Sequence, residues 1–278
     1  MKNKEKTMII KIAYLFLIYL LYELSFKLNI IDLSYLGMFF IRLIFLILSF
    51  YLFNLLFHRN SKKISINFTF NKNILVYSLS LLFFVALFGR ILAPTFDNFV
   101  YPTFSNWSFI IPALIAILLE EISYRGVFQS ILQNTVPFFL VLFVLSINFT
   151  LGHLGWLNVV GTYNLIIQLI TVFLATALLI FVFYLTKSIL MTFLIHLLIN
   201  ALTIFQIYLH MNYPVIELIF WVVWGIFALF FVKYSLNWIT TELKKHFKRV
   251  NFNKNSTLLY ILLILLAFFP FILFLTGI

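Results

Sequence analysis

The sequence predicts an all-α protein, a polytopic transmembrane helical bundle of about nine spans. Three observations predict this fold. Of the 278 residues, 64% are hydrophobic and only 10% are charged, whereas about a quarter of a soluble domain is charged. The apolar residues lie in long runs, close to the roughly 20 residues that a membrane helix needs. These runs do not alternate apolar with polar residues, as the strands of a transmembrane barrel would.

Short polar segments separate nine apolar runs, and each run is expected to form one span. The predicted spans are Met8–Leu28, Tyr35–Phe57, Ile74–Ala93, Ser108–Leu132, Val136–Gly152, Asn164–Leu185, Ser188–Leu209, Val215–Val232 and Leu258–Gly277. An eight-span bundle is the alternative. We divide the chain into N-terminal membrane helices (1–107), a core that carries polar motifs (108–209) and C-terminal helices with a basic loop (210–278).

The basic residues predict the orientation of these spans. With nine spans, 15 of the 19 Lys and Arg residues fall on one side of the membrane. They are Lys2, Lys4, Lys6, Lys11, Arg59, Lys62, Lys63, Lys72, Lys187, Lys233, Lys244, Lys245, Lys248, Arg249 and Lys254. Because loops rich in Lys and Arg remain in the cytoplasm, we expect the N-terminus inside and the C-terminus outside. The net charge of +11 thus has a topological cause, and no nucleic-acid partner is expected.

The first and last parts of the bundle carry signals of their own. Lys11 and Glu23 interrupt the first run, and no small-residue cleavage site follows, so this span is expected to remain as an anchor. Segment Trp238–Arg249 has the pattern of a short basic amphipathic helix on an anionic membrane surface. The richness in Ile, Phe, Asn and Lys is typical of an AT-rich bacterial genome, which suggests a multi-pass protein of a bacterial cell membrane. The absence of cysteine excludes disulfides and thiolate sites.

Acidic side chains within the spans are rare and mark candidate functional positions. In the fourth span, Glu121 and Arg125 are four residues apart with the acid first, the favoured order of an intrahelical ion pair. Glu120 is rotated from Glu121 by about 100°. A charge at the centre of the bilayer costs about 2.5–3.5 kcal/mol on insertion scales. Packing therefore explains Glu121 and Arg125 well, but explains Glu120 poorly.

Two later spans carry histidines on polar faces. Phe149 and His153 share a face at the end of the fifth run, and His196 and Asn200 share one in the seventh. Singly, these pairs would be interpreted as an interfacial histidine and as hydrogen bonding between helices. Together they lead us to expect that Glu120, His153, His196 and Asn200 converge on one cavity. At 1.5 Å per residue, Glu120 and His196 both lie about 12 Å from the inner side, whereas His153 lies about 25 Å away in a straight helix.

The three patterns Glu-Glu-x-x-x-Arg, Phe-x-x-x-His and His-x-x-x-Asn resemble those of the CPBP intramembrane endopeptidases. That family includes type II CAAX prenyl endopeptidases and bacteriocin-processing and immunity relatives. The resemblance covers about Ser108 to Leu209 and implies hydrolysis of a membrane-associated peptide or protein. It implies that Glu120 and His153 activate water and that His196 and Asn200 stabilise the oxyanion. The supporting residues that it implies are Glu121, Arg125 and Phe149.

Alternatives remain for both the mechanism and the function. No cofactor is required for the glutamate-based mechanism, but Glu120, His153 and His196 would also make a His₂Glu zinc set. The chain lacks a His-Glu-x-x-His motif, which favours the metal-free mechanism. The rival function is a non-catalytic peptidase-like membrane protein that acts in bacteriocin immunity or regulation. A small transporter ranks third, because no paired repeat is recognisable. The sequence leaves the substrate and the oligomeric state open.

Overall fold

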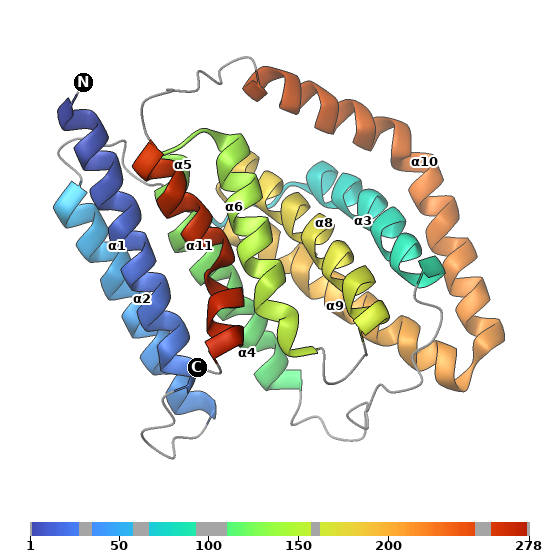
Figure 1. Cartoon of the computed structure of the whole chain (residues 1–278). Helices are drawn as coiled ribbons and strands as arrows, with labels where there is room; N and C mark the ends of the chain where they lie inside the picture. Colours follow the sequence, from blue (N-terminus) through green and yellow to red (C-terminus); the bar gives the residue numbers. More distant parts are fainter. Residues whose placement is uncertain are drawn as a thin grey trace. The chain divides into compact units, whose positions relative to one another are not determined.

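The computed structural model describes residues 2–27, 35–57, 67–92, 110–156, 162–247 and 257–276. Each of the nine predicted runs coincides with a helix or a series of helices, and this part of the chain contains no β-strand, so the all-α class is confirmed (Figure 1). The helices are α1 (Lys2–Lys27), α2 (Tyr35–Phe57), α3 (Lys72–Leu92), α4 (Ile110–Glu121), the π-helix η3 (Ile122–Gln129), α5 (Ser130–Gln133), α6 (Phe138–Leu151), the 3₁₀-helix η4 (Gly152–Trp156), α8 (Thr162–Thr186), α9 (Ile189–Asn212), α10 (Pro214–Phe247) and α11 (Thr257–Thr276).

Four of the described helices are long and apolar enough to cross a membrane. The qualifying stretches are Lys72–Ile91, Ile166–Thr186, Ile189–His210 and Pro214–Lys245, and two shorter apolar stretches are Phe138–Leu154 and Ile261–Phe271. The count of nine spans stays a prediction. Several predicted features lie outside the described residues: the span ends at Leu28, Ala93, Ser108 and Gly277, and the basic residues Arg59, Lys62, Lys63, Lys248, Arg249 and Lys254.

The chain divides into two compact units, which we describe separately. The first comprises Met1–Ile66, Pro102–Asn148 and Asn251–Ile278, and the second comprises Asn67–Tyr101 and Phe149–Val250. The chain passes from the first unit to the second within α6, between Asn148 and Phe149. The second and third polar motifs therefore belong to the second unit, and the first motif belongs to the first.

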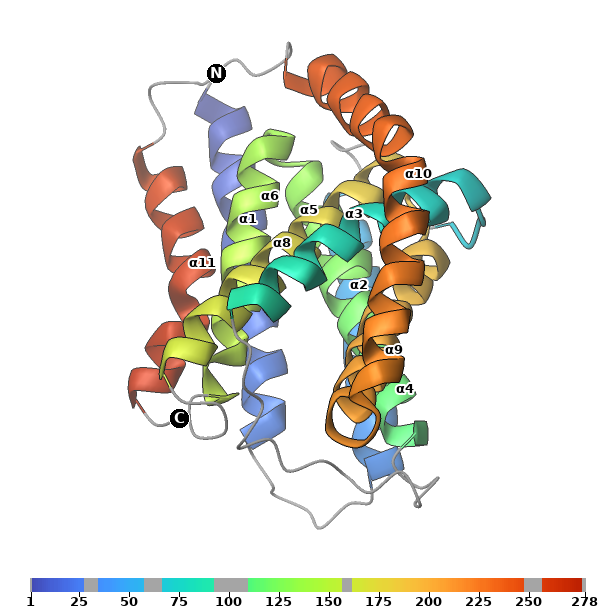
Figure 2. The same ribbon diagram turned by 90° about the vertical axis from the view of Figure 1, so that its right-hand side faces the viewer.

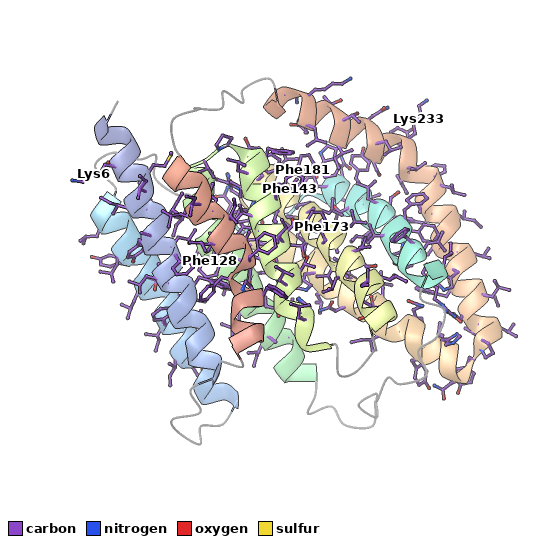
Figure 3. The ribbon with its side chains drawn as sticks, in the orientation of Figure 1. Lys6, Phe128, Phe143, Phe173, Phe181 and Lys233 are labelled. Atoms are coloured by element: carbon purple, nitrogen blue, oxygen red, sulfur yellow. The ribbon has the colours of Figure 1, made fainter. Side chains whose placement is uncertain are left out.

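In the first unit, α1 packs against α2 and α11, and α2 packs against α4 and η3. Its centre is aromatic: the buried ring of Tyr19 meets Phe128 and Phe269 edge-on, with centroids 5.3 and 5.6 Å away, and Phe128 is labelled in Figure 3. Edge-on contacts suit the charge distribution of aromatic rings. Beside them, Tyr124 Oη donates to Asn148 Oδ1 at 3.2 Å, and Asn148 Nδ2 donates to the Leu266 carbonyl at 2.6 Å. These two bonds join η3, α6 and α11.

In the second unit, α3 packs against α8, α9 and α10 (Figure 2). The buried apolar cluster between them consists of Leu82, Leu178, Leu179, Val182, Met191 and Ile195. Two glycines let helices approach closely, because a Cβ atom at Gly89 would lie 3.0 Å from the Thr171 hydroxyl and one at Gly225 would lie 3.2 Å from the Phe83 ring. Gly89 thus fits α3 against α8, and Gly225 fits α10 against α3.

Helix α10 differs from the prediction of a span followed by a separate amphipathic piece. It runs unbroken over 34 residues, or about 51 Å at 1.5 Å per residue, and so exceeds a hydrocarbon core of about 30 Å. It bends near Lys233, which Figure 3 labels. Ser235 Oγ donates to the Phe231 carbonyl and Thr240 Oγ1 to the Leu236 carbonyl. Such back-bonding bends helices without ending them, and no Gly or Pro lies between residues 232 and 247 to stop this one.

The turn between α8 and α9 is held by the extended residues that precede α3. The Asn67 N–H donates to the Lys187 carbonyl at 2.7 Å, and the Ile189 N–H donates to the Asn67 carbonyl at 3.1 Å. Ser188 Oγ donates to the Thr69 carbonyl at 2.6 Å. Lys187 has a φ of 54°, a left-handed conformation that side chains other than Gly adopt only where their surroundings fix it. The N-terminus of α9 is therefore tied to the segment before α3.

Candidate active site

The two neighbouring acids of the first motif lie in different environments. Glu121 ends α4 with its side chain 0% exposed, and its Oε2 lies 3.4 Å from Nε of the equally buried Arg125. This is the ion pair that the four-residue spacing predicts. Glu120 is only partly buried, and Ser123 Oγ donates to its main-chain carbonyl at 3.0 Å. One carboxylate is thus committed to a buried ion pair, while its neighbour retains solvent access.

A π-helix follows directly after the two acids. The predicted span Ser108–Leu132 does not continue as an α-helix, because Ile122–Gln129 form η3, in which all residues except Ile122 are buried. A π-helix forms i→i+5 bonds, is rare, and is frequent at functional sites. Ser130 Oγ also reaches the Arg125 carbonyl, five residues back, at 3.1 Å. The first motif therefore has a local conformation that its sequence pattern does not reveal.

In the second unit, both predicted histidines, His153 and His196, lie close to the aromatic ring of Phe149. Its ring centroid lies 4.8 Å from that of His153 and 6.2 Å from that of His196. His153 Nδ1 lies 2.8 Å from the Phe149 carbonyl oxygen. Because a carbonyl oxygen only accepts, Nδ1 carries the proton, and in the neutral ring Nε2 is the basic nitrogen. This tautomer is the one in which Nε2 can take a proton.

The third motif lies on α9, a helix whose N-terminus is capped. Ser188 is the N-cap, and its Oγ accepts from the Met191 N–H at 3.3 Å. His196 is buried, with 7% exposure, and Asn200, one turn later, is partly buried. His153 lies on η4, just beyond the end of α6. Glu120 belongs to the first unit and these three residues to the second, so their convergence with Glu120 stays a prediction.

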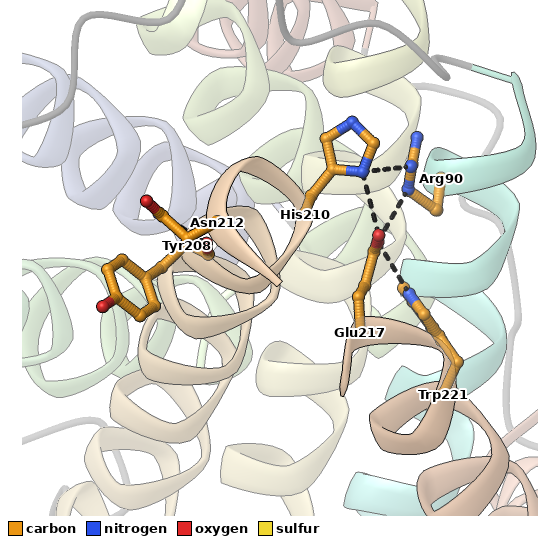
Figure 4. A network of polar contacts seen from close by, with 6 residues as sticks. All are labelled: Arg90, Tyr208, His210, Asn212, Glu217 and Trp221. Atoms are coloured by element: carbon orange, nitrogen blue, oxygen red, sulfur yellow. Dashed lines mark hydrogen bonds and ion pairs between the residues drawn. The ribbon is translucent and has the colours of Figure 1, made fainter. Parts of the chain in front are cut away.

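Two polar groupings have no counterpart in the predicted site. One is the bond between Tyr124 and Asn148 described above. The other links Arg90 of α3 with His210 and Glu217, at the adjoining ends of α9 and α10 (Figure 4). The sequence holds a signal for the second grouping, because an arginine closes one apolar run and an acid opens another. Within the described part of either unit, no three His, Asp or Glu side chains are grouped as metal ligands.

Comparison with known families agrees with the three motifs. Residues 102–202 match the family model described as Rce1-like, type II CAAX prenyl endopeptidase Rce1-like. The matched segment includes every motif residue from Glu120 to Asn200. The match to residues 102–202 supports membership of the CPBP family, and together with the apolar helices it points to a membrane protein. Comparisons with curated proteins and with solved structures gave no significant match.

Proposed function

We propose that the chain is an intramembrane endopeptidase that hydrolyses a peptide bond of a membrane-associated protein or peptide. The observation that carries this proposal is the Rce1-like match, because it encloses all three polar motifs. In the proposed reaction, Glu120 and His153 take a proton from water as its oxygen attacks the scissile carbonyl carbon. His196 and Asn200 donate hydrogen bonds to the resulting oxyanion. The proton then passes to the leaving amine as the C–N bond breaks.

The described geometry supports these roles one residue at a time. A base for water must be able to accept a proton and to meet water, and Glu120 is partly exposed, whereas Glu121 is fully buried against Arg125. His153 has its proton on Nδ1, which leaves Nε2 as the basic atom. His196 and Asn200 both have N–H groups, which suit an oxyanion hole.

The proposal is tested by comparing the membrane proteomes of cells that carry the wild-type protein and cells that carry Glu120→Ala. We expect at least one membrane-associated substrate to accumulate uncleaved only in the variant. The matched control is Glu242→Gln, which changes an acid that pairs with Lys245 on the exposed surface of α10. Identical proteomes, together with full biological activity of the variant, would favour a non-catalytic membrane protein.

Replacing Asn200 with Ala should leave a slower enzyme. The loss of one oxyanion donor typically lowers turnover by about 10²–10³. The measurement is kcat on a cleaved peptide, with the protein in lipid nanodiscs. Thr203→Ala is the matched control, because Thr203 lies about one turn further along α9, is exposed, and donates to the Ile199 carbonyl of its own helix. Equal rates for the two variants would contradict an oxyanion role for Asn200.

Chelation should distinguish the two mechanisms. If Glu120 and His153 activate water without a metal, the purified protein keeps its activity after treatment with a strong zinc chelator. Elemental analysis should then find no stoichiometric zinc. Loss of activity that zinc restores would instead assign Glu120, His153 and His196 as ligands, with the open fourth position typical of catalytic zinc.

A further inference from the structure

Helix α9, which carries His196 and Asn200, is fixed at its C-terminal end by a polar network outside the predicted site (Figure 4). Arg90 Nε donates to Glu217 Oε1 at 3.1 Å, and Arg90 Nη2 lies 2.8 Å from His210 Nδ1. The same His210 nitrogen lies 2.8 Å from Glu217 Oε2. Trp221 Nε1 donates to Glu217 Oε1 at 3.2 Å. One arginine of α3 therefore joins the C-terminal turn of α9 to the first turn of α10.

The N-terminal end of α9 is also fixed by α3, through the extended residues that precede it. The extended residues before α3 bind the α8–α9 turn through Asn67 and Thr69, as described above. The Asn71 N–H adds a contact of 3.2 Å to Met191 Sδ, in the first turn of α9. Helix α3 and its N-terminal extension thus hold α9 at both ends.

The position of His210 on α9 makes this arrangement relevant to the motif. His210 follows His196 by 14 residues, which is about 21 Å along the axis and about 40° short of four full turns. The two side chains therefore lie on nearly the same face of the helix. A contact that fixes His210 also fixes the rotation of the face that carries His196 and Asn200.

The network is sufficiently buried to act as a rigid attachment. The side chains of Glu217, Arg90 and His210 are 9%, 18% and 32% exposed. Removal of one partner from a buried pair leaves the other charge poorly compensated, which is strongly unfavourable. The forked guanidinium of Arg90 lies within hydrogen-bonding distance of both Glu217 and His210, which a lysine ammonium on its single flexible stem is poorly shaped to do. Because His210 Nδ1 can either accept from Arg90 or donate to Glu217, it makes one of these two bonds at a time, and either bond links α9 to the Arg90–Glu217 pair.

We propose that Arg90, acting through Glu217 and His210, is a positioning residue that sets the rotation and axial position of α9, so that His196 and Asn200 meet the developing oxyanion. This inference rests on the proposed peptidase function. Helix α3 lies outside residues 102–202, so the family-matched segment depends on a residue that the family model does not cover.

The first experiment measures the kinetics of Arg90→Gln in lipid nanodiscs. A displacement of about 1 Å far from the chemistry can lower the rate about 100-fold, so we expect kcat to fall by 10- to 100-fold while KM changes by less than about twofold. Arg90→Lys keeps the charge but loses the forked guanidinium, so its kcat should lie between those of the wild type and Arg90→Gln. Glu242→Gln, which removes an exposed ion pair on α10, should match the wild type. An unchanged kcat in Arg90→Gln would overturn the proposal.

The second experiment measures the position of α9 without using activity. The chain contains no cysteine, so spin labels can be attached at the exposed positions Asn73 of α3 and Ala201 of α9 by cysteine substitution. Pulsed electron spin resonance should give a narrow distance distribution in the wild-type background and a broader or shifted one in Arg90→Gln and Arg90→Lys. An unchanged distribution would overturn the positioning role even if kcat falls. If the distance distribution changes in the Arg90 variants but even the wild-type protein cleaves no substrate, Arg90 still anchors α9, and it is the peptidase proposal that is wrong.

Discussion

Glu120→Gln is expected to abolish cleavage while the protein remains inserted and folded. The amide keeps the size of the carboxylate but can neither carry its charge nor accept the proton of the attacking water. Loss of a general base typically costs about 10²–10⁴ in rate. Because Glu120 is partly exposed and the amide has nearly the same size as the carboxylate, the substitution should not disturb packing. Single-turnover cleavage in nanodiscs gives the rate, and the yield in the membrane fraction reports folding.

Comparison with Glu121→Gln distinguishes the loss of a catalytic base at Glu120 from the mere loss of a negative charge in this part of the chain. If Glu120→Gln kept its activity while Glu121→Gln lost activity at normal yield, the roles of the two acids would be reversed. If both variants kept full biological activity, a non-catalytic function would become the better interpretation. Glu242→Gln again serves as a control for the loss of a glutamate from the chain.

Glu121→Gln is expected to destabilise the protein rather than to impair its chemistry. Glu121 and Arg125 have no exposed side-chain surface, and Oε2 of Glu121 lies 3.4 Å from Nε of Arg125. Removal of one partner of a buried ion pair costs about 3–5 kcal/mol, because the remaining charge stays buried. We therefore expect a low yield in membranes and unfolding at a lower denaturant concentration than for the wild type.

The double variant Glu121→Gln/Arg125→Met gives this prediction a second measurement. Replacement of both members of a buried pair is often nearly neutral, so the double variant should recover most of the stability that the single variant loses. A double variant as unstable as Glu121→Gln would show that Arg125 does more than compensate Glu121. A single variant with wild-type stability would contradict the buried-pair argument.

The sequence predicts the features that depend on short stretches of chain. Long apolar runs predict the helices, because length and composition alone determine whether a segment can be helical in a bilayer. The Glu121–Arg125 pair follows from its spacing along one helix. The contact of Phe149 with His153 follows in the same way, although His153 itself lies on a 3₁₀-helix rather than on an extension of α6.

The features that the sequence does not predict depend on distant partners. Arg90 meets His210 and Glu217 across 120 and 127 residues of chain, a pairing that no local pattern encodes. The run Ile122–Gln129, which includes Arg125 and Gly126, holds no pattern that distinguishes a π-helix from an α-helix. Its neighbour in space, Asn148 of α6, bonds to Tyr124 across 24 residues. In α10, the basic residues indicate a change of surroundings, but they do not interrupt the hydrogen bonding of the helix.

The π-helix also predicts where the chain can change in length. A π-helical stretch contains an extra residue relative to an α-helix with the same ends. Loss of one residue between Gly126 and Gln129, which leaves the Glu121–Arg125 spacing unchanged, can therefore be absorbed by conversion to α-helix, with the flanking helices kept in register. The same deletion between His196 and His210 would rotate the rest of α9 by about 100°. Engineered single-residue deletions are thus expected to be tolerated in η3 after Arg125 and to be harmful in α9, where the spacing of the motif and of its anchor must both be preserved.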